Sequence, residues 1–126
     1  MRSLGAVTFI ALIMTAAVAA AGPAPEARAR SAAYWRDMCS GQQQGVARAE
    51  QDRMCLLYLS SFHDAVDEYG EAGHRMFCPP DTMSAEAMRR DFLVYMADIH
   101  ETAEYFPVGR ALLLALMRAH PCVTSR

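Results

Sequence analysis

The sequence predicts an all-α fold, a small disulfide-stapled bundle of about four helices. Apolar residues recur at steps of three and four over several long stretches, which is the spacing of amphipathic helices. No stretch has the alternation or the enrichment in β-branched residues that is typical of a strand. Four cysteines follow an apolar N-terminal segment, which indicates an exported domain held together by disulfide bonds.

Residues 1–21 have the pattern of a secretory signal peptide. Arg2 is followed by an uncharged, mostly apolar run from Ser3 to Ala21, which ends in small residues. An uncleaved membrane anchor is the alternative, since the run is only slightly shorter than a membrane span. The alanine-rich end favours cleavage, so we expect no stable membrane insertion after the signal is removed.

The remaining residues are expected to form one domain. Residues 22–30 contain two prolines and are predicted to be a flexible lead-in, and residues 31–126 a single helical domain. A domain of this size buries only about 60–65% of its unfolded surface, so covalent cross-links would matter. The formal net charge is −2 and there is no lysine, which gives no support for binding to nucleic acid or to anionic lipid.

The first two predicted helices differ greatly in length. Ser31 can cap a short helix that runs through Cys39, because serine accepts a hydrogen bond from the first turn. Residues 40–45 hold two glycines and three glutamines and are predicted to be a loop. From about Val46 to Tyr69, apolar residues follow helical spacing, which predicts an amphipathic helix of about six turns.

A turn-rich bridge over residues 70–80 leads to the third predicted helix. Asp81 or Thr82 can cap it, and its apolar face carries Met88, Phe92 and Met96. We expect residues 100–105 to connect this helix to the last one.

The last predicted helix lies between Pro107 and Pro121. Proline fits the first turn of a helix but cannot continue one, so the pair brackets about fourteen residues. Residues 112–117 are all apolar, which a helix on the surface would not tolerate. The sequence therefore predicts that this helix is the centre of the fold, with Leu113 and Leu116 deeply buried.

The four cysteines, Cys39, Cys55, Cys78 and Cys122, permit three pairings. A zinc site is the rival, but their spacings contain no metal-binding pair, and we predict no metal ion and no cofactor. We predict disulfides Cys39–Cys55 and Cys78–Cys122. The first would join the short helix to the long one, and the second would join the C-terminus to the start of the third helix. Loop-closure entropy assigns them about 3 and about 4 kcal/mol of stability.

No catalytic motif is present. The histidines, at positions 63, 74, 100 and 120, have no recognised motif spacing, and a surface role explains each of them. If all cysteines are paired, no thiol is left as a nucleophile. We therefore predict that the protein is not an enzyme.

Several short motifs resemble the Rap1a/Tai family of immunity proteins over about residues 34–122. The matching pieces, in order, are Cys39, Cys55 with Tyr58, Asp64, Phe77-Cys78-Pro79, Phe92-x-x-Tyr95-Met96, the helix over 111–117, and His120-Pro121-Cys122. Two details depart from the family pattern. Ser60 to Phe62 stand where a glycine is frequent, and Ile99-His100-Glu101 where a His-Pro-Glu turn is frequent.

The resemblance implies a small helical periplasmic protein, commonly a dimer. Such proteins bind and block peptidoglycan amidases delivered by type VI secretion, and so protect the producing cell. A periplasmic helical chaperone or generic binding module is the alternative. The two differ in partner specificity, because an immunity protein binds one cognate enzyme, whereas a chaperone binds many unfolded chains.

Two connections are candidates for the partner-binding surface, because the apolar helix faces are used in the core. One is the loop from Gly70 to Arg75. The other presents Glu101, Glu104 and Tyr105 next to the last helix, and we favour it. A tyrosine beside carboxylates can fill a pocket while the carboxylates pair with polar groups at its rim.

Overall fold

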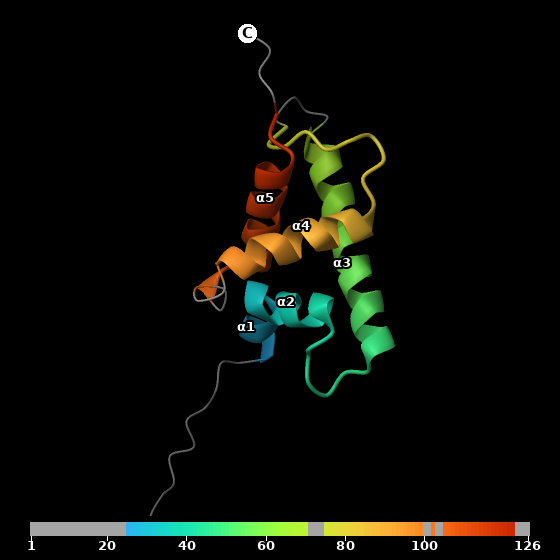
Figure 1. The fold of residues 1–126 in the computed structure, drawn as a ribbon, viewed down its shortest axis with the longest axis vertical. Helices are drawn as coiled ribbons and strands as arrows, with labels where there is room; N and C mark the ends of the chain where they lie inside the picture. The colour runs from blue at the N-terminus through green and yellow to red at the C-terminus, as the bar shows by residue number, and fades with distance from the viewer. Residues whose placement is uncertain (1–24, 71–74, 100–101, 103–104, 123–126) are drawn as a thin grey trace, which may run out of the picture.

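A computed structural model describes residues 25–70, 75–99, 102 and 105–122 of the chain (Figure 1). The described residues form five helices, so the predicted all-α fold is confirmed. They are α1 (Pro25–Ala29), α2 (Ala32–Ser40), α3 (Arg48–Gly70), α4 (Ala85–Asp98) and α5 (Val108–Ala119). The predicted signal peptide lies outside the described residues. Within them, no helix combines the length and apolar character needed to cross a membrane.

The segment expected to be a flexible lead-in contains the helix α1. It begins at Pro25, and proline is frequent in the first turn of a helix. Two contacts hold α1 to the next helix: Ser31 Oγ donates to Arg28 O at 2.9 Å, and the indole N–H of Trp35 donates to Ala29 O at 2.8 Å. These contacts with α2 stabilise the five-residue helix, and they could not be predicted from its short sequence.

The predicted cap of α2 is confirmed. Ser31 has extended backbone angles, and its hydroxyl accepts the backbone N–H of Tyr34 at 3.2 Å. The helix ends at Ser40 and is capped by Gly41, whose φ of 74° lies in the left-handed region that glycine adopts without strain.

The predicted cap of α4 is wrong. Ser84, and not Asp81 or Thr82, caps the helix by accepting the N–H of Ala87 at 3.2 Å. Residues 81 and 82 belong instead to a turn after the two prolines, closed by Met83 N donating to Pro80 O at 3.2 Å. Because of this turn, α4 begins a few residues later than predicted.

Pro107 also has a different place from the predicted one. It is the capping residue just before α5 and has an extended backbone. In that conformation the chain pairs with the start of α2: Ala32 N donates to Phe106 O at 2.7 Å, and Val108 N donates to Arg30 O at 2.9 Å. The entrances of α2 and α5 are therefore fixed to each other.

The helix at the centre of the fold is α4, and the prediction that the last helix takes this place is wrong. Figure 1 shows α4 crossing α3 and α5 at a steep angle, and it packs against both of them and against α2. The helix α5 packs mainly against α4 and α2. Leu116 is fully buried as predicted, but Leu113 is only partly buried, because one side of α5 faces a surface recess.

The core lies between α2, α3, α4 and α5. Its largest fully buried side chains are Met38, Leu59, Met88, Phe92, Met96, Leu112 and Leu116. Every helix from α2 to α5 contributes at least one of them, so removing any of these four helices from the others would expose core surface to water.

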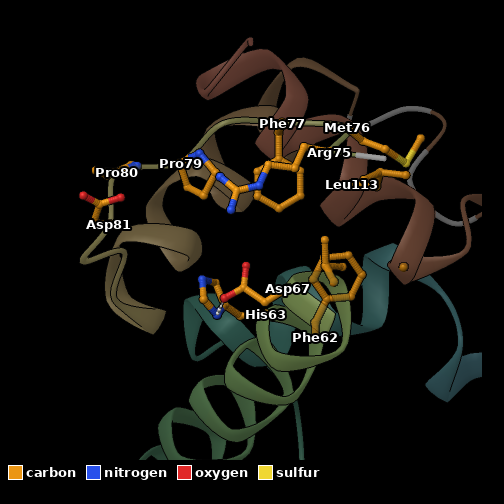
Figure 2. Close-up of a pocket in the computed structure, with 12 residues that line it drawn as sticks. Phe62, His63, Asp67, Arg75, Met76, Phe77, Pro79, Pro80, Asp81 and Leu113 are labelled. Carbon is orange, nitrogen blue, oxygen red and sulfur yellow. Dashed lines mark ion pairs between the residues drawn. The ribbon is translucent and has the colours of Figure 1, made fainter. Parts of the chain in front are cut away.

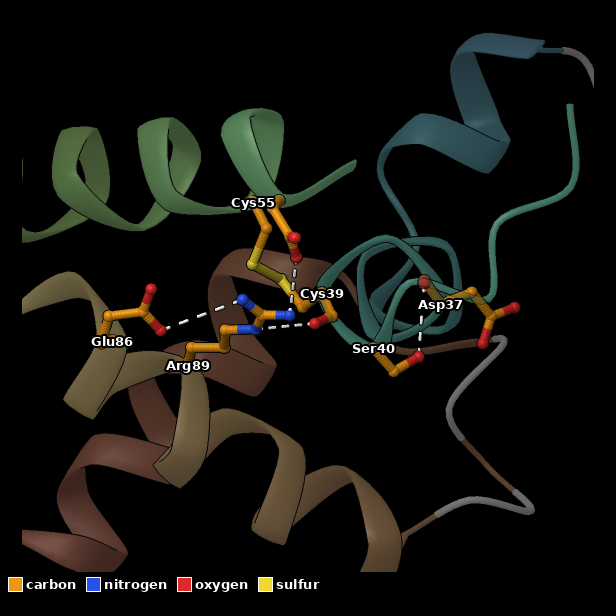
Figure 3. The surroundings of a disulfide bond; sticks show 7 residues. Asp37, Cys39, Ser40, Cys55, Glu86 and Arg89 are labelled. Carbon is orange, nitrogen blue, oxygen red and sulfur yellow. Dashed lines mark hydrogen bonds and ion pairs between the residues drawn. A yellow bond between two sulfur atoms is a disulfide. The ribbon is translucent and has the colours of Figure 1, made fainter. Parts of the chain in front are cut away.

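Both disulfides have the predicted connectivity, Cys39–Cys55 and Cys78–Cys122. The first is buried between α2 and α3, and the second is exposed. Arg89 of α4 lies against the buried disulfide (Figure 3). Its Nε donates to Cys39 O at 2.7 Å, and its Nη2 donates to Asp52 Oδ1 at 2.9 Å. One arginine thus joins α4 to both helices that the disulfide connects.

Candidate partner-binding surfaces

The first candidate surface is a cavity of about 400 Å³ next to the C-terminal half of α3, here called the α3 cavity (Figure 2). Its walls come from α3, from residues 75–81 and from the first turns of α5. The lining residues are Phe62, His63, Val66, Asp67, Arg75, Met76, Phe77, Pro79, Pro80, Asp81, Gly109 and Leu113. This volume falls within the range of small-molecule pockets.

The wall formed by residues 75–81 is held in place at its middle. Phe77 is buried in the core, the next residue is bonded through its sulfur to Cys122, and the backbone N–H of Cys78 donates to His120 O at 2.8 Å. This wall is therefore fixed to the end of α5 before any partner binds, which lowers the ordering cost of binding.

The floor of the α3 cavity is apolar because three large side chains remain only partly covered. Phe62, Val66 and Leu113 pack against the core with one side and line the cavity with the other. Gly109 adds no side chain, and a Cβ placed there would lie 4.0 Å from the Phe62 ring. The missing side chain at this position leaves the space open.

Charged groups surround this apolar floor. His63 and Asp67 lie on the α3 side, with His63 Nδ1 3.5 Å from an Asp67 carboxylate oxygen. Arg75 comes from the opposite wall, and Asp81 lies at the far end of the opening (Figure 2). An apolar floor with a charged rim is the usual anatomy of a pocket that receives one anchoring side chain of a protein partner.

The second candidate surface is a recess of about 840 Å³, here called the tyrosine groove. It lies between α1, α2 and the loop that follows α2, and its lining includes Tyr34, Tyr105 and Gln42 to Gln44. The loop is held from beneath by the buried side chain of Gln51, which accepts from Gln43 N at 3.0 Å and donates to Gln43 O and Val46 O. The edge of the groove is therefore ordered.

The structure places one of the three predicted partner-binding residues. Tyr105 is 85% exposed and lines the tyrosine groove, beside the start of α2. Glu101 and Glu104 lie outside the described residues. Of the alternative loop from Gly70 to Arg75, residues 71–74 lie outside them as well, and Arg75 lines the α3 cavity.

Each described histidine lies against a carboxylate. His63 faces Asp67 as above, and His120 Nε2 lies 2.8 Å from an Asp91 carboxylate oxygen. Nowhere in the described ranges do three or more His, Cys, Asp or Glu residues gather as a metal ion would require. His74 and His100 fall outside those ranges.

Sequence reasoning missed both recesses. The partly exposed positions of Phe62, Val66 and Leu113 are spaced as core residues, and helical spacing cannot distinguish a covered apolar face from one that lines a cavity. The closest available signal was Gly109, a residue with low helix propensity in the first turn of an otherwise strong helix. It marks the place where the cavity opens.

Comparison with known proteins adds one match. A family model described as Rap1a immunity proteins matches residues 31–122. This span runs from the cap of α2 to the last cysteine and includes every residue that lines the α3 cavity. No curated protein and no solved structure matches the chain.

Proposed function

Because this chain belongs to the Rap1a immunity protein family, we propose that it binds and blocks a peptidoglycan amidase delivered by a type VI secretion system. The family match over residues 31–122 is the observation that carries the proposal. Proteins of this family are inhibitors and not enzymes, and they act on a partner effector. The amidase, its route of delivery and the place of action are the parts that we add.

The place of action that we propose is the periplasm. The signal-peptide pattern over residues 1–21 supports export, and the pairing of all four cysteines supports an oxidising compartment. An amidase that cleaves the cell wall has to be blocked on the side of the inner membrane where its substrate lies. The predicted signal peptide and the two disulfides both suit a protein with that task.

The mechanism that we propose is occupation of the cleft of the amidase, with no turnover by this protein. An amidase with a Cys/His pair needs an open cleft to admit peptidoglycan, so a rigid protein seated there excludes the substrate. The disulfides and the paired entrances of α2 and α5 support a rigid surface. Rigidity favours affinity because little conformational freedom remains to be lost on binding.

The surface that we propose for the cleft is Glu101, Glu104 and Tyr105. The exposure of the Tyr105 side chain supports it, since an exposed tyrosine can bury a large area with few rotatable bonds. Tyr34 lines the same groove and can extend that contact.

The family resemblance also suggests a homodimer, which light scattering of the purified protein would identify by its mass.

The test is to express the cognate amidase in the periplasm together with this protein. The wild-type chain should restore growth, and a triple variant, Glu101→Ala, Glu104→Ala and Tyr105→Ala, should not. The matched control is Glu50→Ala with Arg53→Ala, an exposed ion pair on α3 that lines neither recess. The control variant should protect as well as wild type.

Each result has a separate meaning. If the wild-type chain gives no protection and no complex forms, the immunity function against this amidase is wrong. If the folded triple variant protects fully, only the choice of surface is wrong. If the protein instead binds many unfolded chains with similar affinity, the chaperone alternative replaces the proposal.

A further inference from the structure

We propose that the α3 cavity receives a long basic side chain, an arginine or a lysine, from the cognate effector. This inference rests on the proposed function and adds a second contact site to it, apart from Tyr105. Neither Tyr105 nor Tyr34 lines the α3 cavity, and none of the α3 cavity residues lines the tyrosine groove.

The shape of the cavity suits an extended side chain with an apolar stem. Phe62, Val66 and Leu113 offer a floor for methylene groups, and Phe77 adds an aromatic wall. Arginine and lysine bury their methylene stems along such surfaces while the charged end stays at a polar edge. The planar guanidinium of arginine can also stack on an aromatic ring.

The charges around the cavity favour a cation. Asp67 and Asp81 line it. The facing positive groups are Arg75 and, when protonated, His63. The two carboxylates outnumber the positive groups whenever His63 is neutral. The side chain of Asp67 is 64% exposed and so remains accessible to a partner despite its contact with His63.

The end of α3 strengthens this preference. A helix C-terminus carries partial negative charge, which basic residues in the last turn usually offset. The last turn of α3 contains no basic residue, and Asp67 and Glu68 stand close to its end. This negative charge is left uncompensated by α3 itself, and a cation from the partner would neutralise it.

The open volume depends on Gly109, which allows the cavity to be filled without removing any native group. A leucine at position 109 would extend from the 4.0 Å contact with Phe62 into the cavity. An alanine there adds one methyl group and leaves most of the space. Gly109→Leu and Gly109→Ala are therefore a matched pair that differs in the volume they occupy.

The contribution of the negative charge of Asp67 is tested with a second matched pair of variants. Asp67 and Asp64 both lie within 4.0 Å of His63 Nδ1, at 3.5 and 3.9 Å, but only Asp67 lines the cavity. Asp67→Asn and Asp64→Asn remove the same charge from the same helix. Any difference between them reports on the cavity and not on the net charge of the protein.

The experiment is calorimetric titration of the purified cognate amidase with each variant at low and high salt, after circular dichroism has verified folding. We expect Gly109→Leu and Asp67→Asn to weaken binding about tenfold or more, as loss of a central anchor does. Gly109→Ala and Asp64→Asn should stay within about twofold of wild type. Salt should weaken wild-type binding more than binding by Asp67→Asn, because that variant has lost the charge pair.

The outcomes separate this inference from the proposed function. If wild type binds and both cavity variants bind equally well, the cavity inference is wrong and the proposed function stands. If wild type does not bind, the proposed function fails for that amidase and the inference fails with it. If Gly109→Leu changes the oligomeric state and not the affinity, the cavity receives a second copy of this chain. Should Gly109→Leu fail to fold, Asp67→Asn decides the question alone.

Discussion

Arg89 shows how much of the fold can depend on a single side chain. It is only 16% exposed and connects the Cys39 carbonyl, Asp52 and, more distantly, Glu86. Arg89→Ala should lower the free energy of unfolding by about 2–3 kcal/mol, because a charged hydrogen bond is lost and a half-buried carbonyl is left without its donor. Urea unfolding followed by circular dichroism measures the change.

The control for this prediction is the neighbouring arginine. Arg90 is exposed on the same helix, so Arg90→Ala should change stability by less than about 0.5 kcal/mol. Equal effects of the two substitutions would contradict the role assigned to Arg89.

The hydroxyl of Tyr58 is expected to lose its proton at a higher pH than a free tyrosine does. It is stacked on Trp35 with ring centroids 4.0 Å apart, and burial raises the pKa of its hydroxyl above the usual 10.0. Because the raised pKa belongs to the folded state, the associated stability is complete below about pH 10 and is lost as pH rises through the folded value. Absorbance titration of tyrosinate should show a late component that Tyr58→Phe removes. An unchanged titration curve in that variant would show that another tyrosine is responsible.

At the scale of single residues, the features that depend on local residue type and spacing could be predicted from the sequence. The cap at Ser31 and the four paired cysteines follow from residue type and spacing. The cap of α4 did not, because Asp81, Thr82 and Ser84 are all good capping residues. Only the hydrogen bond that closes the turn after the prolines decides among them.

The helix α5 provides the test at the scale of an element. Leu116 is fully buried against the core, whereas Met117, the next residue, is 36% exposed. Leu116→Ala should lower the free energy of unfolding by about 2–5 kcal/mol, as large-to-small core substitutions do. Met117→Ala should lower it by clearly less. A loss below about 1 kcal/mol for Leu116→Ala would mean that α5 is peripheral.

Element boundaries were easier to predict than element positions. Helical periodicity located α3 and α5 to within about two residues, as expected from the spacing of their apolar faces. The central position of α4 was missed, since the sequence of α5 is more apolar than its burial requires. Part of that excess, Leu113, lines the α3 cavity.

At the scale of the whole molecule, the two disulfides should differ in their response to reductant. Cys39 and Cys55 are buried, whereas Cys78 and Cys122 are exposed. A mild thiol reagent should therefore reduce Cys78–Cys122 first, and stability should then fall by about 4 kcal/mol, the value expected for a 44-residue loop. Alkylation of the released thiols followed by peptide mapping identifies the bond. Prior reduction of Cys39–Cys55 would contradict the assigned burial.

The fold class of the whole molecule was predictable, and its binding surfaces were not. Helix period, cysteine count and proline positions are local properties, and together they specify an all-α domain with two cross-links. A cavity arises where α3, the segment near Phe77 and α5 meet, and no local pattern records which apolar side chains remain uncovered there. Tyr105 could be chosen from sequence because residues between helices are generally exposed.

The central proposal is that this protein inhibits one cognate amidase by occupying its substrate cleft. The most direct measurement is the hydrolysis of purified peptidoglycan by that amidase as increasing amounts of this protein are added. The account predicts that activity falls in proportion to the added protein and reaches zero at a fixed molar ratio, with an unrelated amidase unaffected. Full activity at a large excess of folded, disulfide-bonded protein would contradict it.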